Sequence, residues 1–219
     1  DGGSSDNTLE VIKKHEKNIS KFITGKDKGI YDAMNQGISL SSGKYIGFLN
    51  SDDVFAEDKT LAFIKEIIKK EDPDVIYGDI EYVDKNDVEK VIRYWDSKEF
   101  NSKNLKYGWM PPHPSFYIKK EVYDKHGSYD LKYKISADYD LMTRILLDKT
   151  LKVSYLPRVF VRMRVGGESN RFSNVFKKLC EDFRIIKSNK IGGLPTLFLK
   201  SFLKIPQYFI NKKWLIYKK

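Results

Sequence analysis

The chain has 219 residues, 41% of them hydrophobic, so it can build the core of one ordinary domain, and global disorder is excluded. Its single cysteine, Cys180, excludes an internal disulfide, and no cluster of His and Cys surrounds it, so no zinc site is predicted. The net charge of +10 belongs to residues 171–219, which hold 12 Lys and Arg against 2 Asp and Glu. Residues 1–170 hold 28 of each sign and sum to zero.

The first 80 residues predict an alternation of helices and strands. Ser4 or Ser5 with Asp6 is expected to cap a first helix. The continuous apolar run at 45–49 predicts a strand buried on both faces, as in a parallel sheet. The predicted elements are a helix whose apolar positions include Leu9 and Ile12, strands at 19–23, 45–49 and 75–78, a helix over 30–38, and a helix from about Asp58 with Leu61, Ile64, Ile67 and Ile68 inward.

After Asp79 the alternation changes, and the first expected feature is a hairpin. Strands are predicted at 80–83, 88–94, 115–118, 153–156 and 159–163, and helices around Val122 and Tyr123, over 138–147, and from Asn174 to near the end. The pattern predicts an α/β fold with a mixed sheet flanked by helices. Residues 1–170 would form the domain, and residues 171–219 a basic helical tail.

Asn50-Ser51-Asp52-Asp53 directly follows the predicted strand at 45–49. In an open α/β sheet, ligands bind at the carboxyl ends of the strands, so Asp52 and Asp53 are placed to hold a divalent cation. Carboxylate oxygens suit Mg²⁺ or Mn²⁺, and these ions also bind substrate phosphates. A solvated acidic turn is the alternative interpretation, and this motif alone favours that alternative.

Two further acidic segments lie at predicted helix starts. In Asp1-Gly2-Gly3-Ser4-Ser5-Asp6 the glycines allow a ligand to approach the backbone, and Asp1 could hydrogen-bond a base or ribose. A polar turn with a helix cap explains this segment equally well. Asp138 is suited to act as a general base toward a sugar hydroxyl, although it could also be a simple cap. For Asp140 we favour a capping role or an ion pair with Arg144, four residues on.

The order and spacing of these segments resemble the inverting glycosyltransferases of family 2, of the bacterial polysaccharide-assembly type, over roughly residues 1–170. The matching segments are Asp-Gly-Gly-Ser-x-Asp-x-Thr from Asp1, Lys-Asp-Lys-Gly-Ile-Tyr-Asp-Ala-Met-Asn-x-Gly at 26–37, Gly-Lys-Tyr-Ile-Gly-Phe-Leu-Asn-Ser-Asp-Asp at 43–53 and Ala-Asp-Tyr-Asp-Leu-Met-Thr-Arg at 137–144. The resemblance implies a GT-A fold. It also implies that a strand and helix should precede Asp1, so we expect an N-terminally truncated chain.

The implied activity is transfer of a sugar from a nucleotide-diphosphate sugar to a glycan or lipid-linked acceptor with inversion, in cell-surface polysaccharide synthesis. Carried over residue by residue, the resemblance implies that Asp138 is the catalytic base. It implies that Asp1, Asp32, Asp52 and Asp53 bind the donor. Asp52, with Asp53 beside it, would hold the divalent metal, Mn²⁺ or Mg²⁺.

The chain departs from the family pattern at two positions. Asn50 replaces the first Asp of Asp-x-Asp, which could weaken metal binding, and Ala137 replaces the Glu that precedes the base. The acceptor side has further candidates in Asp140 and Arg144, and in His113, which lies in a proline-bounded loop.

Residues 194–214 interleave apolar and aromatic side chains with lysines, but no stretch reaches 18 uncharged apolar residues. This composition predicts a basic helix lying on an anionic membrane surface. A helix packed on the body is an equal alternative, because Pro195 and Pro206 interrupt a long amphipathic face. We expect a cytoplasmic protein, peripheral at the inner face of the cell membrane, with no nucleic-acid partner.

Two rival functions remain. A nucleotidyltransferase on a related α/β fold would carry basic residues in a glycine-rich phosphate loop, whereas residues 1–8 have glycines but no Lys or Arg. A non-catalytic module that binds nucleic acid through the basic tail would leave the acidic motifs of residues 1–170 without a purpose. The sequence leaves open the donor sugar, the nucleotide base, the acceptor, the linkage and the oligomeric state.

Overall fold

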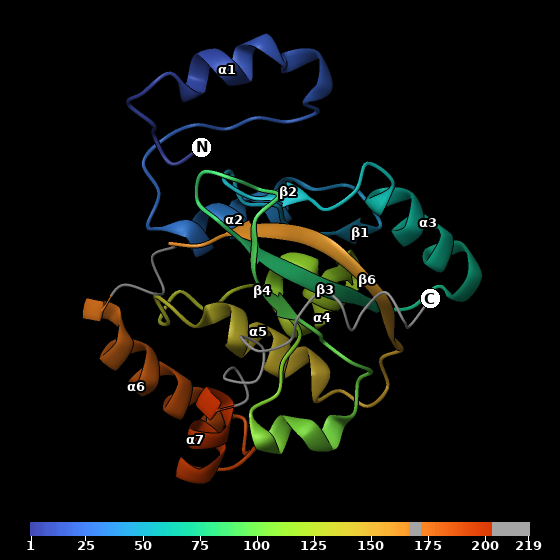
Figure 1. The fold of residues 1–219 in the computed structure, drawn as a ribbon, viewed down its shortest axis with the longest axis vertical. Coiled ribbons are helices and arrows are strands. Elements are labelled where there is room, and N and C mark those ends of the chain that lie inside the picture. Colours follow the sequence, from blue (N-terminus) through green and yellow to red (C-terminus); the bar gives the residue numbers. More distant parts are fainter. Residues whose placement is uncertain (167–171, 203–219) are drawn as a thin grey trace.

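A computed structural model of the chain describes residues 1–166 and 172–202, which form a mixed sheet with helices packed on its faces (Figure 1). The strands are β1 (Tyr45–Ile46), β2 (Val54–Phe55), β3 (Val75–Val83), β4 (Val91–Trp95), β5 (Tyr117–Lys119) and β6 (Val153–Arg164). The helices are α1 (Thr8–Lys14), α2 (Ile30–Leu40), α3 (Thr60–Glu71), α4 (Lys120–His126), α5 (Ala137–Leu146), α6 (Phe172–Ser188) and α7 (Leu194–Phe202), with short 3₁₀ helices η1 (Glu16–Asn18), η2 (Ser102–Tyr107) and η3 (His113–Ser115). The predicted α/β class and mixed sheet are confirmed.

The sheet has the order β1-β5-β3-β6-β2, and β4 pairs with β3. β3 and β6 run parallel, and the other strand pairs of the described chain are antiparallel. The β3–β6 register shifts around Gly78, where a Cβ atom would lie 2.6 Å from the ring of Phe160. Glycine therefore allows the two central strands to stay paired across this irregularity.

Burial on both faces explains the apolar run in β3. Val75 and Tyr77 face the larger core, with residues of α2, α4, α5 and α6, while Ile76 and Ile80 face the smaller one, which includes Ile64 of α3. This alternation is the two-residue period of a strand. The doubly buried strand is therefore β3.

The prediction of a doubly buried strand at 45–49 was wrong. Only Tyr45–Ile46 is a strand, Ile46 is its one buried residue, and Leu49 is 43% exposed. β1 pairs with β5 alone, so no strand covers its other side in the described chain.

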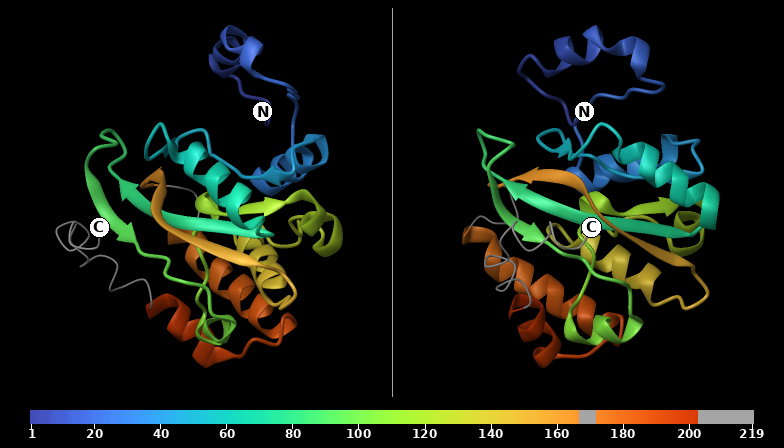
Figure 2. Two further views of the ribbon diagram at one scale, coloured as in Figure 1. Left: turned by 90° about the vertical axis from the view of Figure 1, so that its right-hand side faces the viewer. Right: turned by 45° about the vertical axis from the view of Figure 1, so that its right-hand side comes forward.

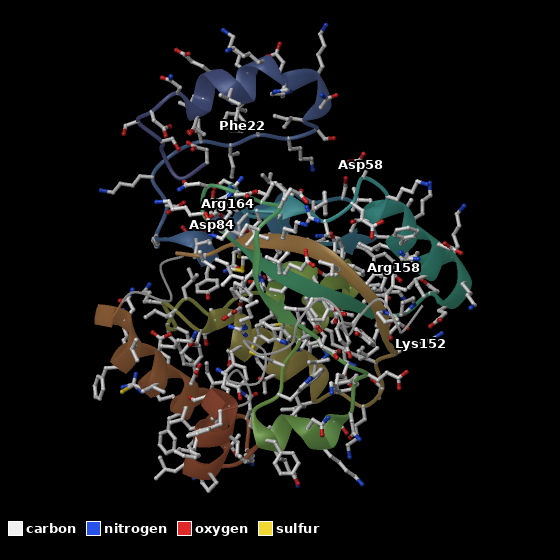
Figure 3. All side chains as sticks on the ribbon, viewed as in Figure 1. Phe22, Asp58, Asp84, Lys152, Arg158 and Arg164 are labelled. Atoms are coloured by element: carbon white, nitrogen blue, oxygen red, sulfur yellow. The ribbon has the colours of Figure 1, made fainter. Side chains whose placement is uncertain are left out.

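Residues 1–25 project from the body as a loop and helix (Figure 2). The first predicted helix forms as α1, but it buries none of its residues, and Leu9 is 39% exposed. The strand predicted at 19–23 does not form. Phe22 on this segment is 46% exposed and lies away from the body (Figure 3). A strand needs cross-strand partners, and no described strand lies beside this segment.

Several later predictions are confirmed, with three changes, the first of which is that the strands predicted at 75–78 and 80–83 are one continuous β3. The hairpin of β3 and β4, the helices α3, α4 and α5, and strand β5 all form near their predicted places. The two strands predicted at 153–156 and 159–163 are one continuous β6. Leu61 of α3 is 53% exposed rather than inward.

The helix predicted from Asn174 is two helices, α6 and α7, separated by a segment containing Gly192 and Gly193. Both pack on the body, because Ile185 and Ile186 are fully buried in the larger core and the Thr196 hydroxyl donates to the Lys106 carbonyl at 2.8 Å. For residues 172–202, packing on the body is therefore observed. The tail prediction for residues 203–219 lies outside the described residues. No helix in the described ranges is both long and apolar enough to span a bilayer.

Candidate functional site

A cleft of about 720 Å³ lies where α2, the 48–52 segment, η3 and the start of α5 come together. Residues of β3, β6, α6 and α7 also line it. Of the predicted site residues, the cleft is lined by Asp1, Asp52, His113 and Asp138, whereas Asp32, Asp53, Asp140 and Arg144 are not part of its wall.

Asp138 lies in the first turn of α5 and is partly exposed. Its Oδ1 accepts the backbone amide of Tyr139 at 2.8 Å and the Tyr31 hydroxyl at 3.2 Å. That hydroxyl also lies 2.8 Å from the Ile135 carbonyl oxygen, so its one proton is shared between two acceptors. Oδ2 of Asp138 has no hydrogen-bond partner among the described residues. One carboxylate oxygen is therefore fixed and the other is open to a ligand.

Tyr31 belongs to a cluster of four rings, in which Tyr129 contacts it directly and Phe48 and His113 pack on Tyr129. Tyr31 stacks on Tyr129 with ring centroids 5.3 Å apart, and the Tyr129 hydroxyl lies 2.6 Å from Nε2 of His113. Phe48 stacks on His113. Burial raises the pKa of Tyr31 far above its ordinary value, and the charge of Asp138 adds to this, so the hydroxyl stays protonated and donates. Burial also lowers the pKa of His113, which favours a neutral ring.

The 50–53 turn separates the two adjacent aspartates. Asp52 is exposed, and its carboxylate forms no hydrogen bond or ion pair in the described part of the chain. Asp53 is 6% exposed, and it accepts the Asn50 side-chain amide at 2.8 Å and the Arg164 backbone amide at 3.2 Å. Burial raises the pKa of Asp53. Asp53 thus braces the turn that presents Asp52.

Arg164, labelled in Figure 3, lies at the end of β6 and holds the same turn with its side chain. Its Nε donates to the Asp52 carbonyl at 2.9 Å, and its Nη1 donates to the Lys85 carbonyl at 2.7 Å. The backbone of Asp52 is therefore fixed by β6, while the side chain remains available.

The 50–53 turn supplies few protein ligands for a divalent ion. No cluster of three His, Cys, Asp or Glu side chains occurs in residues 1–166 or 172–202. Asp52 offers an uncommitted carboxylate, and the Asn50 side-chain nitrogen donates to Asp53, while no described residue donates to the Asn50 Oδ1. One carboxylate and one amide oxygen suit Mg²⁺ or Mn²⁺, which take remaining ligands from water and substrate phosphates.

Asp1 lines the cleft, but its carboxylate is occupied by its own loop. Oδ2 accepts the backbone amides of Gly3 and Ser4 at 3.0 and 3.1 Å and the Thr24 hydroxyl at 2.7 Å. Oδ1 accepts the Ser4 hydroxyl at 2.5 Å. In this arrangement Asp1 organises the glycine loop.

The remaining predicted residues make internal contacts. Asp32 accepts the Lys28 amide at 3.0 Å and so stabilises the start of α2. Asp140 is 4% exposed and pairs with Arg144 at 2.8 Å, as the favoured interpretation for Asp140 expected. Arg144 also donates to the carbonyls of His126 and Ser128. This pair braces the 126–128 segment and is turned away from the cleft wall.

Sequence reasoning missed the residues that position Asp138. Tyr31 lies within the matched 26–37 segment, so a signal existed there. Tyr129 is held by paired hydrogen bonds to Asn35, both at 2.9 Å, and had no sequence signal. Ser136 lines the cleft with a buried hydroxyl that has no partner among the described residues.

Comparison with known proteins gives a consistent assignment. The sequence profile of "Glycosyl transferase family 2" matches residues 1–127. A PGL/p-HBAD biosynthesis glycosyltransferase of Mycobacterium bovis is 29% identical over 175 residues, covering 78% of this chain and 66% of the relative. An uncharacterized glycosyltransferase of Methanocaldococcus jannaschii is 21% identical over 187 residues, covering 82% and 63%. The chain therefore spans somewhat less than two thirds of these relatives' length.

Solved structures share the fold at lower identity. TarS of S. aureus in complex with UDP-GlcNAc aligns with a TM-score of 0.64 at 18% identity, over 85% of this chain and 56% of that one. The mannosyltransferase PcManGT of Pyrobaculum calidifontis, in complex with GDP-Man and Mn²⁺, aligns with a TM-score of 0.59 at 12% identity, over 93% and 59%. The profile match over more than half of the residues, on this fold, shows that the chain belongs to glycosyltransferase family 2.

Proposed function

We propose that the chain transfers a sugar from a nucleotide-diphosphate sugar to a hydroxyl of a glycan or lipid-linked acceptor, with inversion at the anomeric carbon. The observation that carries the proposal is that two uncommitted carboxylates line one cleft. Among the described residues, the Asp52 carboxylate has no hydrogen-bond or ion-pair partner and Oδ2 of Asp138 has no hydrogen-bond partner. A base for the acceptor and an anchor for the donor are the two groups that this reaction requires.

In the proposed reaction Asp138 acts as the general base. Its Oδ2 accepts the proton of the acceptor hydroxyl while the acceptor oxygen forms a bond to the anomeric carbon. The bond from that carbon to the diphosphate oxygen breaks on the opposite face, which inverts the configuration. The diphosphate leaves with the electron pair. The Tyr31 and Tyr139 donors hold Oδ1, so the carboxylate is oriented before substrate binds.

Asp52, with Oδ1 of Asn50, is the proposed anchor for Mn²⁺ or Mg²⁺ in the donor complex. A divalent ion supplies neutralisation of the charge that grows on the departing diphosphate. Asp53 and Arg164 keep the turn rigid, and the Asp1 loop would lie beside the nucleoside. The structural neighbours bind UDP, UDP-GlcNAc and GDP-Man, which supports a nucleotide-sugar donor here without fixing its base.

We also propose that α6 and α7 face an anionic membrane that carries the acceptor. Large apolar side chains on these helices are exposed: Phe176 (77%), Leu194 (67%), Phe198 (61%) and Phe202 (47%). Residues 203–219 add five lysines and no acidic residue. Apolar side chains combined with lysines favour a peripheral position at a lipid surface.

The proposal is tested by calorimetric titration of UDP and GDP, each with and without Mn²⁺, on wild type, Asp52→Asn and Asp138→Asn. We expect metal-dependent binding of one nucleotide, lost in Asp52→Asn and retained in Asp138→Asn. The rate of sugar transfer from the nucleotide sugar whose nucleotide binds should fall about 10²- to 10⁴-fold in Asp138→Asn, the range for loss of a general base. Absence of nucleotide binding by the wild type, with or without metal, contradicts the proposal.

A further inference from the structure

A carboxylate on α6 binds the backbone immediately before α5. Glu181 is 4% exposed. Its Oε1 accepts the amide of Lys134 at 2.9 Å, and its Oε2 accepts the amides of Ile135 at 2.9 Å and Ser136 at 3.0 Å. Three consecutive backbone amides thus donate to one side chain, which lies at least 45 residues further along the sequence.

The segment that Glu181 holds leads directly into the site. Ser136 is the residue that precedes α5, and Asp138 lies two residues further on. The Ile135 amide is held by Glu181 at 2.9 Å, while the Ile135 carbonyl lies 2.8 Å from the same Tyr31 hydroxyl that contacts Asp138. The segment is therefore hydrogen-bonded to both α6 and α2, and these two helices together fix the position of Asp138.

α5 has no local substitute for this contact. Ser136 makes no side-chain capping hydrogen bond, and its hydroxyl is buried without a partner among the described residues. The negative charge of Glu181 lies at the end of the helix where the macrodipole favours an anion. Loss of the carboxylate would leave three amides short of acceptors at this end.

We infer that Glu181 is a positioning residue for Asp138, which makes α6 part of the catalytic unit. The inference rests on the proposed role of Asp138 as the base. Glu181 does not line the cleft, so it acts through the 134–136 backbone. A shift of the base by about 1 Å is enough to lower a rate about 10²-fold.

The test uses the full chain with Glu181→Gln and Glu181→Ala. Glutamine keeps the shape but replaces one acceptor oxygen by a donor, and alanine removes a fragment equivalent to acetate. The matched control is Glu71→Gln on α3, where Glu71 accepts the Ser154 hydroxyl at 2.8 Å, away from the 134–136 segment. The rate is measured as release of nucleoside diphosphate from UDP-GlcNAc or GDP-mannose, whichever binds, with water as the acceptor.

We expect kcat to fall about 10²-fold in Glu181→Ala and by a smaller factor in Glu181→Gln. The affinity for nucleotide and Mn²⁺ should stay within twofold, because the 50–53 turn is untouched. Added acetate should restore part of kcat in Glu181→Ala, whereas acetamide at the same concentration should not. A kcat equal to that of Glu71→Gln, at a temperature where all variants are folded, overturns the inference. An equal loss of kcat and of nucleotide affinity also overturns it.

Amide hydrogen exchange separates this inference from the proposed function. The amides of residues 134–136 should lose protection in both Glu181 variants and keep it in Glu71→Gln, and this readout needs no activity. Unchanged protection in Glu181→Ala overturns the inference even if transfer is observed. Unchanged kcat in Asp138→Asn, with the loss of protection present, overturns the proposed base and with it the positioning role, while the backbone contact itself stands.

Discussion

His113 shows how the cleft constrains a single residue. Burial lowers its pKa below the ordinary 6.5, and the nearby charge of Asp138 offsets only part of this effect. The ring lies 2.6 Å from the Tyr129 hydroxyl and stacks on Phe48, so a proton on it would be poorly solvated. Tyr129 in turn stacks on Tyr31, which contacts Asp138. His113 therefore supports the aromatic cluster behind the proposed base.

This environment predicts a pH dependence of stability. Above pH 6.5 His113 is neutral in both the folded and unfolded states, so its full contribution to the free energy of unfolding is present. Below pH 6.5 the unfolded chain takes up the proton first, so the free energy of unfolding falls by up to about 1.4 kcal/mol per pH unit until the folded pKa is reached. The measurement is urea unfolding between pH 5 and 7.5.

His113→Gln should show a shallower slope than the wild type over the same range. His15→Gln, in the exposed segment after α1, should keep the wild-type slope. Identical slopes in wild type and His113→Gln would contradict the prediction.

The adjacent aspartates at 52 and 53 show the limit of a motif. The sequence predicts both at the metal, with Asp52 as the matched ligand and Asp53 beside it, and it gives no reason for Asp53 to be buried. The structure gives them different surroundings, because the Asn50 and Arg164 donors approach Asp53 and leave Asp52 exposed. The end of β6, more than 100 residues later, joins Asn50 in determining which carboxylate is available.

At the scale of elements, the pairing of β3 with β6 requires a glycine at position 78. A Cβ on Gly78 would lie 2.6 Å from the Phe160 ring and 2.7 Å from the Arg158 carbonyl oxygen. Gly78→Ala should therefore destabilise the protein by about 1–3 kcal/mol through overpacking. Denaturant midpoints measure the change.

Gly37 within α2 provides the matched control. A Cβ there would have its nearest neighbour, on Phe48, at 3.9 Å, which is ordinary contact. Gly37→Ala should stabilise the protein by about 0.5–1 kcal/mol, because alanine costs less backbone entropy in a helix. Destabilisation by Gly37→Ala equal to that of Gly78→Ala would show that the close approach at Gly78 is not the cause.

The contact between α6 and α7 rests on a buried ion pair. Lys200 lies 2.6 Å from Asp182, and their side chains are 6% and 5% exposed. The Lys200 ammonium also lies 3.4 Å from the centre of the Tyr139 ring, and burial lowers the pKa of Lys200. The pair thus connects both C-terminal helices to α5.

Removing one partner leaves the other charge buried, so Asp182→Leu or Lys200→Met alone should cost about 3–5 kcal/mol of stability. The double variant Asp182→Leu with Lys200→Met should cost clearly less than the sum, since no lone charge remains. Thermal unfolding of the four proteins forms the cycle. Additive losses would rule out coupling between the two residues.

At the scale of the whole molecule, residues 172–202 belong to the body. The positive charge of residues 171–219 is therefore divided between this packed part and residues 203–219. Ile185, Ile186 and Ile191 lie in the larger core with residues of α5. Residues 203–219, which lie outside the described residues, carry a charge of +5. We therefore expect the lysines of residues 203–219 to strengthen membrane contact without being required for folding.

Two truncations test this separation. A chain ending at Phe202 should unfold cooperatively near the wild-type temperature but sediment less with phosphatidylglycerol vesicles, because each lysine near an anionic surface contributes about 1 kcal/mol. A chain ending at Gly166 should lose cooperative unfolding. Equal vesicle binding by the Phe202 truncation and the wild type would contradict the membrane role of the last residues.

The sequence by itself determined the fold class, the family resemblance and the short segments that line the cleft. These follow from local chemistry, because apolar periodicity, turn residues and contiguous motifs each involve residues that are close together in the sequence. The helix with Asp138 at its start and the turn with Asp52 were both predictable for this reason.

Only the tertiary structure decided the rest. It placed β3 rather than the 45–49 run between two cores, separated Asp52 from Asp53, and turned Asp140 and Arg144 away from the cleft. It also brought Glu181 to the backbone before Asp138. These outcomes depend on contacts between residues tens to over 100 positions apart, which no local pattern records, because burial and hydrogen-bond partners exist only once the chain has packed.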